Sequence, residues 1–121
     1  MGSTVLKKSE HQAQREFLGE FEQIVMLAIL RLRDRAYGMT IRQEIVSRAG
    51  RDVTVSAVYI TLDRLLAKGY VSDFKGEPTT ERGGRAKRFF RVEGKGMKAL
   101  QRSQHAMSKM SAGLELMPEA I

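Results

Sequence analysis

Apolar residues recur at helical spacing in four segments of this 121-residue chain. In the first segment, Phe17–Arg33, they form a stripe that is too wide for a lone surface helix. Such breadth indicates a helix that is buried against its own domain and also against a second subunit. A short polar turn, Asp34–Tyr37, is expected to separate this helix from the next one.

The second and third helices are predicted at Thr40–Ala49 and Val55–Lys68. Gly50 stands where the C-terminal end of a helix favours a left-handed residue. Thr54 is the expected N-cap of the third helix, and Gly69 is its expected end.

Two strand-like segments follow, Tyr70–Lys75 and Ala86–Val92, in which aromatic and β-branched residues are frequent. The segment between them, Gly76–Arg85, contains a proline and a pair of glycines and is predicted to be a long hairpin tip. A last helix is predicted over Gly94–Leu116. The fold class is therefore mainly α with one small β-hairpin.

The third predicted helix has two different faces. At about 100° per residue, Val58, Leu62 and Leu65 share the face that packs inward. The other positions are mostly small or polar, so this helix can approach base edges closely, and its hydroxyl groups can reach phosphates. The candidate DNA contacts on this segment are Thr54, Ser56, Ala57, Tyr59, Ile60 and Arg64.

A structural interpretation stands beside this functional one. Ser56 can simply be an N-terminal helix residue, and Tyr59 can be a half-buried packing residue. Ile60 suits a thymine methyl group, yet a single exposed isoleucine is also ordinary on protein surfaces.

Five basic residues and no acidic one lie within the ten residues Arg82–Arg91. In a strand, neighbouring side chains point to opposite faces, so Phe90 and Val92 can pack inward while the basic residues stay in solvent. The glycine pair lets the backbone approach a phosphate or a minor groove. The alternative is a charged edge that prevents strand pairing between molecules. The candidate DNA contacts of the hairpin are Arg82, Arg85, Lys87 and Arg88.

The last predicted helix carries a coiled-coil-like seam, in which Leu100, Met107 and Leu114 lie seven residues apart. Such a stripe needs a partner, and we expect it to pack on the first helix of a second subunit. Methionine adapts to irregular partners, so the seam can fill a dimer core or accommodate an effector between subunits. The candidate dimer-interface residues are Phe17, Phe21, Met97, Leu100, Met107, Met110 and Leu114.

Net charge narrows the choice of partner. The chain carries +7 with a pI near 10.1, which favours a polyanion such as nucleic acid or an anionic membrane surface. No segment is long and apolar enough for a transmembrane helix or reads as a signal peptide. We therefore expect a cytoplasmic protein with no membrane association.

Candidate chemistry is sparse in this chain. Cysteine is absent, which excludes disulfides and thiolate metal sites, and His11 and His105 have no ligand-like spacing. No catalytic triad or phosphate-binding loop pattern occurs, so neither an enzyme nor a cofactor or metal site is expected.

Several motifs occur in order over Leu18–Leu100. Tyr37-Gly38 precedes the second helix, Val58-Tyr59 with Leu62 and Arg64-Leu65 lies in the third, and the sequence Arg82-Gly83-Gly84-Arg85 lies in the hairpin. This set resembles the PadR-type transcriptional regulators. The resemblance implies a winged helix-turn-helix, a homodimer and usually a repressor of a nearby operon.

The resemblance assigns DNA contact to Ser56, Tyr59 and the basic residues of the wing. We expect the chain to consist of an N-terminal extension (residues 1–16), a winged-helix DNA-binding domain (17–93) and a C-terminal dimerisation helix with its tail (94–121). Some members sense aromatic or lipophilic small molecules. Members that bind flat aromatic drugs use a tryptophan at the dimer pore, which this chain lacks, so no effector site is assigned.

Two hypotheses from different classes follow. The first is a homodimeric, sequence-specific regulator of double-stranded DNA, most simply a repressor on a palindromic operator, relieved by an effector in some members. The second is a winged-helix protein-interaction module whose basic hairpin docks an acidic partner.

Overall fold

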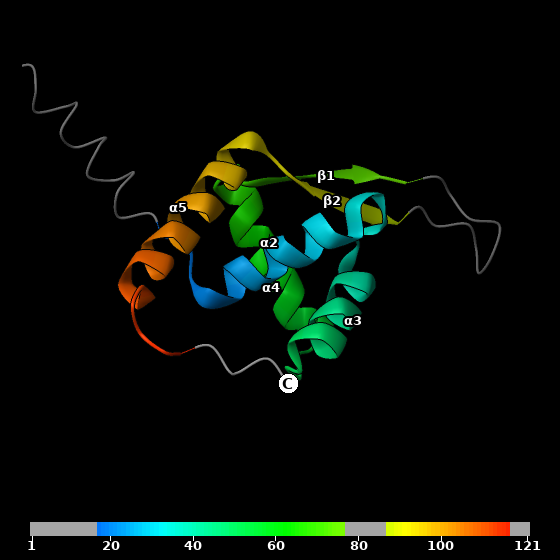
Figure 1. Ribbon diagram of the computed structural model, residues 1–121. Helices are drawn as coiled ribbons and strands as arrows, with labels where there is room; N and C mark the ends of the chain where they lie inside the picture. The colour runs from blue at the N-terminus through cyan, green and yellow to red at the C-terminus, as the bar shows by residue number, and fades with distance from the viewer. Residues whose placement is uncertain (1–16, 77–86, 117–121) are drawn as a thin grey trace, which may run out of the picture.

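Helices pack together beside a two-stranded antiparallel hairpin in the computed structural model, which describes residues 17–76 and 87–116 (Figure 1). The elements follow the predicted order. They are α2 (Glu20–Leu32), the short 3-10 helix η1 (Arg33–Arg35), α3 (Gly38–Ala49), α4 (Val55–Ala67), β1 (Val71–Lys75), β2 (Arg88–Val92) and α5 (Gly94–Ser111). The fold class predicted from the sequence is confirmed.

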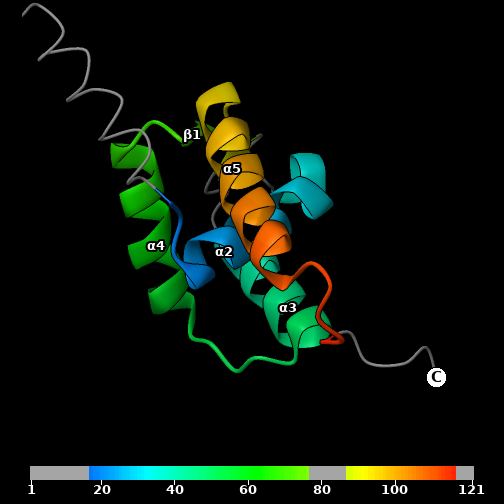
Figure 2. The ribbon, with the colours of Figure 1, turned by 60° about the vertical axis from the view of Figure 1, so that its left-hand side comes forward.

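The core lies around α2. This helix runs between α4 and α5, as Figure 2 shows, and α3 covers its lower part. Val25, Met26 and Ile29 of α2 are almost completely buried, and the largest buried rings are those of Tyr70 and Phe90. One continuous hydrophobic cluster therefore joins the helices to the hairpin.

The predicted helix ends are present. The Thr54 Oγ1 atom accepts a hydrogen bond from the Ala57 N–H at 3.1 Å, so Thr54 caps α4. Gly50 ends α3 with φ of 63°. Gly69 follows α4 with φ of 74°, and the Tyr70 N–H reaches back to the Leu65 carbonyl at 2.9 Å, as in a Schellman motif.

A third extended segment, Ala36–Tyr37, pairs with the hairpin, although the sequence Asp34–Tyr37 predicts only a polar turn. Ala36 is completely buried, and its carbonyl accepts the Phe90 N–H at 2.9 Å. Tyr37 forms an isolated antiparallel bridge with Phe89. The pairing places the start of α3 directly beside β2.

Two expectations for the last helix are wrong. The helix ends at Ser111 rather than near Leu116, because Gly113 takes φ of 82° and the Leu114 N–H turns back to the Ser111 carbonyl at 3.0 Å. Leu114 therefore does not continue a helical seam. Leu100 is only 3% exposed and belongs to the core of its own protomer, so its side chain is not available to a partner.

Glycine at position 96 is required by a close approach of α5 to the hairpin. A Cβ atom there would lie 2.1 Å from the Tyr70 carbonyl oxygen and 3.0 Å from Cε of Met26. The same carbonyl accepts the Glu93 N–H at 2.9 Å, so it has little freedom to move. A Cβ atom at Gly94, in the first turn of the same helix, would meet no atom within 4 Å.

We expect Gly96→Ala to lower the free energy of unfolding by about 1–3 kcal/mol, the usual range for forced overpacking. Gly94→Ala is the matched control, and its effect should be neutral or slightly stabilising because alanine favours helix. Urea unfolding followed by circular dichroism measures both variants. Equal stability of the two proteins would contradict the close approach.

Candidate nucleic-acid interface

Helix α4 has a buried face and an exposed one, as predicted. Val58, Leu62 and Leu65 are fully buried. On the opposite side, Ile60 keeps 56% of its surface exposed. We call this side the reading face; it consists of the exposed residues Ser56, Ile60, Asp63, Arg64 and Ala67. Its N-terminal half, Ser56 and Ile60, carries no charged or long flexible side chain, so another surface can come close to the helix there.

The start of α4 is held by the link from α3. Thr54 is exposed and caps the helix, while Ala57 is half-buried beside it. The Arg42 side chain of α3 donates from Nε to the Val53 carbonyl at 2.8 Å. The first turn of α4, with its free backbone N–H groups, is therefore fixed relative to α3.

Tyr59 fixes α4 against two neighbouring elements. Its half-buried ring lies on Gly38 at the start of α3, where a Cβ atom would meet the ring and its hydroxyl at 2.5 Å. The same ring meets Phe90 of β2 edge-on, with centroids 6.4 Å apart. The Tyr59 ring thus has the packing role that the structural interpretation predicted. A DNA contact by its hydroxyl stays a prediction.

Aromatic side chains form a row along the outer face of the hairpin. The Phe89 ring stacks on Phe74 at 5.7 Å and meets Tyr37 edge-on at 5.4 Å. The Lys87 Nζ atom lies 4.4 Å above the Tyr37 ring and donates to its hydroxyl at 3.2 Å. The Arg91 guanidinium lies 4.4 Å above Phe74. A cation is therefore held at each end of the row.

Sequence reasoning did not assign a role to Tyr37, Phe74 or Arg91. Phe89 and Arg91 lie two residues apart on one strand, so the sequence alone places them on the same face of the hairpin. The partner rings come from other parts of the chain, and only the strand register reveals them.

Arg88, a predicted DNA contact, already has a partner. Its Nε atom forms an ion pair with Asp73 at 2.6 Å, and its guanidinium lies 5.0 Å from the centre of the Phe90 ring. Both charged side chains remain about 40% exposed. Arg82 and Arg85, the two predicted contacts of the hairpin tip, lie outside the described residues.

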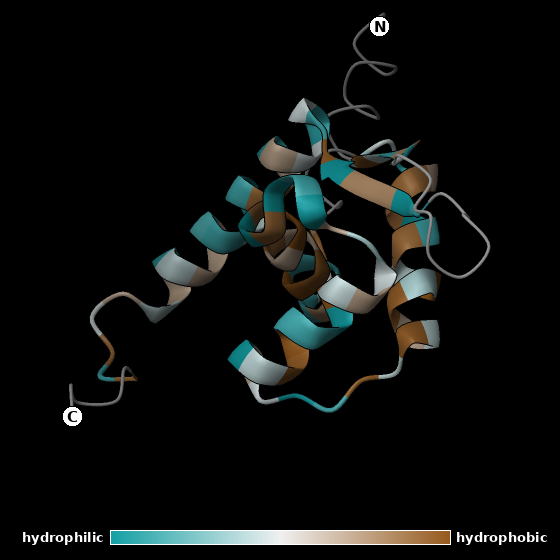
Figure 3. Ribbon diagram, turned by 90° about the vertical axis from the view of Figure 1, so that its right-hand side faces the viewer, coloured by the Kyte–Doolittle hydropathy of each residue, from teal (hydrophilic) through white to brown (hydrophobic). Residues whose placement is uncertain are grey.

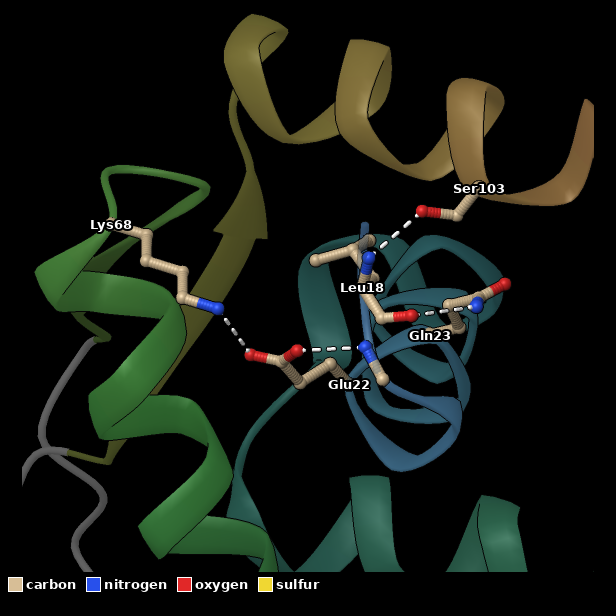
Figure 4. Close-up of polar contacts among 6 residues, drawn as sticks. Leu18, Glu22, Gln23, Lys68 and Ser103 are labelled. Atoms are coloured by element: carbon tan, nitrogen blue, oxygen red, sulfur yellow. Dashed lines mark hydrogen bonds and ion pairs between the residues drawn. The ribbon is translucent and has the colours of Figure 1, made fainter. Parts of the chain in front are cut away.

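An ion pair joins the start of α2 to the end of α4 (Figure 4). The Lys68 Nζ atom lies 2.9 Å from Glu22, and the other carboxylate oxygen of Glu22 accepts the Gly19 N–H at 2.9 Å. Burial raises the pKa of the Glu22 carboxyl. The hydrogen bonds from Gly19 and Lys68, with the charges of Lys68 and Arg64, outweigh burial and hold the pKa below its ordinary value.

A second polar contact holds the chain just before α2 to α5. The Leu18 N–H donates to the buried Ser103 Oγ atom at 2.9 Å, and the Gln23 side chain donates to the Leu18 carbonyl at 3.1 Å (Figure 4). Both backbone groups of Leu18 are therefore satisfied, as burial of that residue requires.

The described residues contain no cluster of three or more His, Asp or Glu side chains that could hold a metal ion. Within residues 17–76 and 87–116, no helix has the length and apolar character needed to cross a membrane.

The geometry of α3, α4 and the hairpin agrees with a sequence match. Residues 26–102 match the Transcriptional regulator PadR-like family. The protein belongs to this family. Its α3 and α4 are the helix-turn-helix of the PadR-like fold, and β1 and β2 form the wing.

Solved PadR-like structures share this fold. A PadR-like transcription factor from Bacteroides fragilis has a TM-score of 0.63 at 23% identity, covering 86% of this chain and 90% of that chain. A PadR family regulator from Eggerthella lenta has a TM-score of 0.60 at 17% identity, covering 90% and 88%. One from Clostridium difficile has a TM-score of 0.59 at 17% identity, covering 75% and 94%. Comparison with curated proteins gave no match.

We expect Glu22→Gln to lower the free energy of unfolding at neutral pH by about 1 kcal/mol, since Lys68 is half-exposed and partly screened. The folded-state pKa lies below the unfolded one, so the stabilisation is present above the unfolded pKa. The difference in free energy of unfolding between wild type and variant should become smaller as the pH falls through the pKa of Glu22 in the folded state. Urea unfolding at several pH values measures this difference.

Glu20→Gln is the matched control. Glu20 lies in the same helical turn but keeps 77% of its side chain exposed in its pair with Arg51. Its loss should change stability by less than about 0.5 kcal/mol. If the loss of stability in Glu22→Gln is as large in acid as at neutral pH, the ionised Glu22 carboxylate is not its cause.

Proposed function

We propose that this PadR-like protein is a homodimeric, sequence-specific DNA-binding repressor that reads a palindromic operator. The observation that carries the proposal is the reading face of α4 beside a wing that presents fixed cations. Family membership supports regulation of transcription. Operator recognition by these residues is our inference.

The N-terminal half of α4 is suited to a major groove. Ser56 and Ile60 are exposed, and no long side chain precedes them on that face. A serine hydroxyl can bond to a base edge or a phosphate, and the apolar Ile60 suits a thymine methyl. Arg64, one turn further along and exposed, can reach the phosphate backbone.

The wing would contribute phosphate contacts rather than sequence reading. The ammonium of Lys87 stands on the Tyr37 ring, next to the start of α3. A cation fixed in this way loses less freedom on binding a phosphate than a free lysine does. Arg88 would have to exchange Asp73 for phosphate, so its contribution should be smaller.

A second subunit would give the two half-sites their spacing of about 34 Å, one turn of DNA. Met107 and Met110 are 67% and 79% exposed on α5, and Phe17 is 49% exposed nearby. On the other side of α2, an apolar groove of about 210 Å³ lies between α2 and α3, lined by Ile24, Leu27, Ala28, Arg31, Glu44, Ile45, Arg48 and Ala49. We infer that the methionine side of α5 packs on α2 of the partner subunit.

An effector would bind most readily at this interface between subunits. The exposed methionines can adapt to an apolar ligand. A ligand that favoured one arrangement of the two subunits would alter the distance between the reading faces, and so the affinity for the operator.

Gel-shift titration on DNA upstream of the protein's own gene, against a random duplex of equal length, tests the function. We expect preferential binding that weakens steeply with salt. Ile60→Glu should lower operator affinity roughly ten- to hundredfold, the range of one lost base contact. Equal wild-type affinity for both duplexes would overturn sequence-specific regulation and favour the protein-interaction module.

Ala67→Glu is the control for Ile60→Glu. It adds the same charge to the same exposed face, at the far end of α4. Its effect on operator affinity should be clearly smaller. Equal losses would mean that the N-terminal half of the reading face has no special role.

We expect Met107→Asp to shift the protein from dimer toward monomer, because a carboxylate cannot be buried in an apolar interface without a partner. Ser108→Asp adds the same charge to the next, exposed position of α5 and should leave the dimer intact. Light scattering over a concentration series measures both. A dimer that persists in Met107→Asp would exclude this face of α5 from the interface.

A further inference from the structure

Helix α5 carries its basic residues along one line. Lys95, Lys98, Arg102, His105 and Lys109 follow one another at intervals of three and four residues. At 3.6 residues per turn, these positions share one face over a length of roughly 21 Å. We call this face the basic stripe. Its members are exposed except for Arg102, which is half-buried.

The charge of α5 is one-sided. The helix contains four Lys or Arg residues and no Asp or Glu, and so holds four of the net seven positive charges of the chain. In Figure 3, α5 is mostly teal and white, whereas brown segments gather in α2 and α4. The positive charge of this helix is thus not balanced within the helix itself.

Four cations outside α5 have acidic partners in the described chain. Arg48 pairs with Glu44, Arg51 with Glu20, Lys68 with Glu22 and Arg88 with Asp73. None of the ion pairs among residues 17–76 and 87–116 includes a residue of α5. The stripe therefore has no acidic partner in the part of the protomer that the structure describes.

This arrangement is unfavourable for an isolated helix. Lys95 lies in the first turn, where the helix dipole favours acids; the nearest acid is the N-cap residue Glu93, whose carboxylate accepts a hydrogen bond from Ser72. Lys98 and Arg102 are four residues apart, a spacing at which like charges repel. By contrast, α2 has Glu20 and Glu22 in its first turn and Arg31 in its last. A polyanion bound to this face would compensate both unfavourable effects, whereas water alone compensates them less.

We propose that the basic stripe is a second DNA-binding surface, which holds the phosphates of a duplex without reading its sequence. The choice of duplex DNA as the occupant rests on the proposed function. Figure 2 places α2 between α4 and α5, so the stripe does not belong to the reading face. The stripe therefore holds a duplex segment other than the one in contact with α4.

Two features favour a duplex over other anionic partners. A helix that lies on a membrane needs large apolar side chains free to insert. In the N-terminal half of α5 the apolar residues Ala99 and Leu100 are buried in the protomer, and the exposed Met107 and Met110 of the C-terminal half lie on the side that we assign to the dimer interface. In addition, a row of cations about 21 Å long matches a continuous line of phosphates better than a single acidic side chain.

The test compares two double variants on a short random-sequence duplex. Lys98→Gln with Lys109→Gln removes two exposed charges, and Lys98→Arg with Lys109→Arg keeps them. Fluorescence anisotropy over a salt series gives the dependence of log K on log salt. We expect the magnitude of that slope to fall by about 1 for each lost phosphate contact, so by about 2 per protomer in the glutamine variant only.

The second readout is capture of another duplex. Wild-type protein saturated with one immobilised duplex should retain a second, labelled duplex at low salt, and the glutamine variant should not. A glutamine variant that keeps both the wild-type slope and the capture would overturn the proposal. Thermal melting confirms that both variants are folded.

Two further measurements distinguish this proposal from membrane binding and from operator recognition by α4. Stripe-dependent binding to phosphatidylserine vesicles with an unchanged duplex slope would overturn the proposal and assign the stripe to a membrane surface. Ile60→Glu should lower operator affinity as stated above and leave the stripe-dependent part of the random-duplex slope intact. If wild type showed no operator preference, the proposed function would fail while the stripe could still be measured.

Discussion

The contact between Gly38 and the Tyr59 ring fixes the relative position of every element near the reading face. The ring occupies the space in which any other side chain at position 38 would lie. This lets α4 cross close to the start of α3 and lean on Phe90 of the wing. Because Tyr37 precedes Gly38 and pairs with Phe89, the same few residues also hold the wing. These contacts join the helix-turn-helix to the described strands of the wing, so a binding surface that spans both needs no rearrangement between them.

The sequence allowed prediction of whatever depends on neighbours along the chain. Thr54, Gly50 and Gly69 mark helix ends through local backbone chemistry, and the spacing of Val58, Leu62 and Leu65 separates the faces of α4. Contacts between distant segments were not predictable in this way. The burial of Ala36, the partners of Phe89 and the ion pair of Arg88 depend on strand register. The inward position of Leu100 depends on the approach of α5 to Tyr70, which only the absence of a side chain at Gly96 permits.

The candidate site was predictable to a similar degree. The exposure of Ser56, Ile60 and Arg64 follows from helical periodicity. The same periodicity places Leu62 on the buried face, so Leu62 is not a candidate DNA contact. Tyr59 was ambiguous because a tyrosine at the flank of a helix is suited to both packing and contact. The structure gives its ring a packing role through Gly38 and Phe90, neither of which is near it in sequence. For Lys87 the sequence indicated only charge, whereas the structure adds the ring that holds the ammonium in place.

Charge is organised differently on the two sides of α2. Toward α4, Lys68 is paired with Glu22 and serves to hold one helix against another. Along α5 the cations have no such partner among the described residues, and the methionines Met107 and Met110 lie on the side away from Lys98 and His105 at about 100° per residue. In a two-fold dimer the same patches meet each other, so a face of like charges is unsuited to the contact and an apolar face is suited to it. The proposed use of the methionine side for dimerisation thus leaves the basic stripe of both subunits facing outward, where a polyanion can reach it.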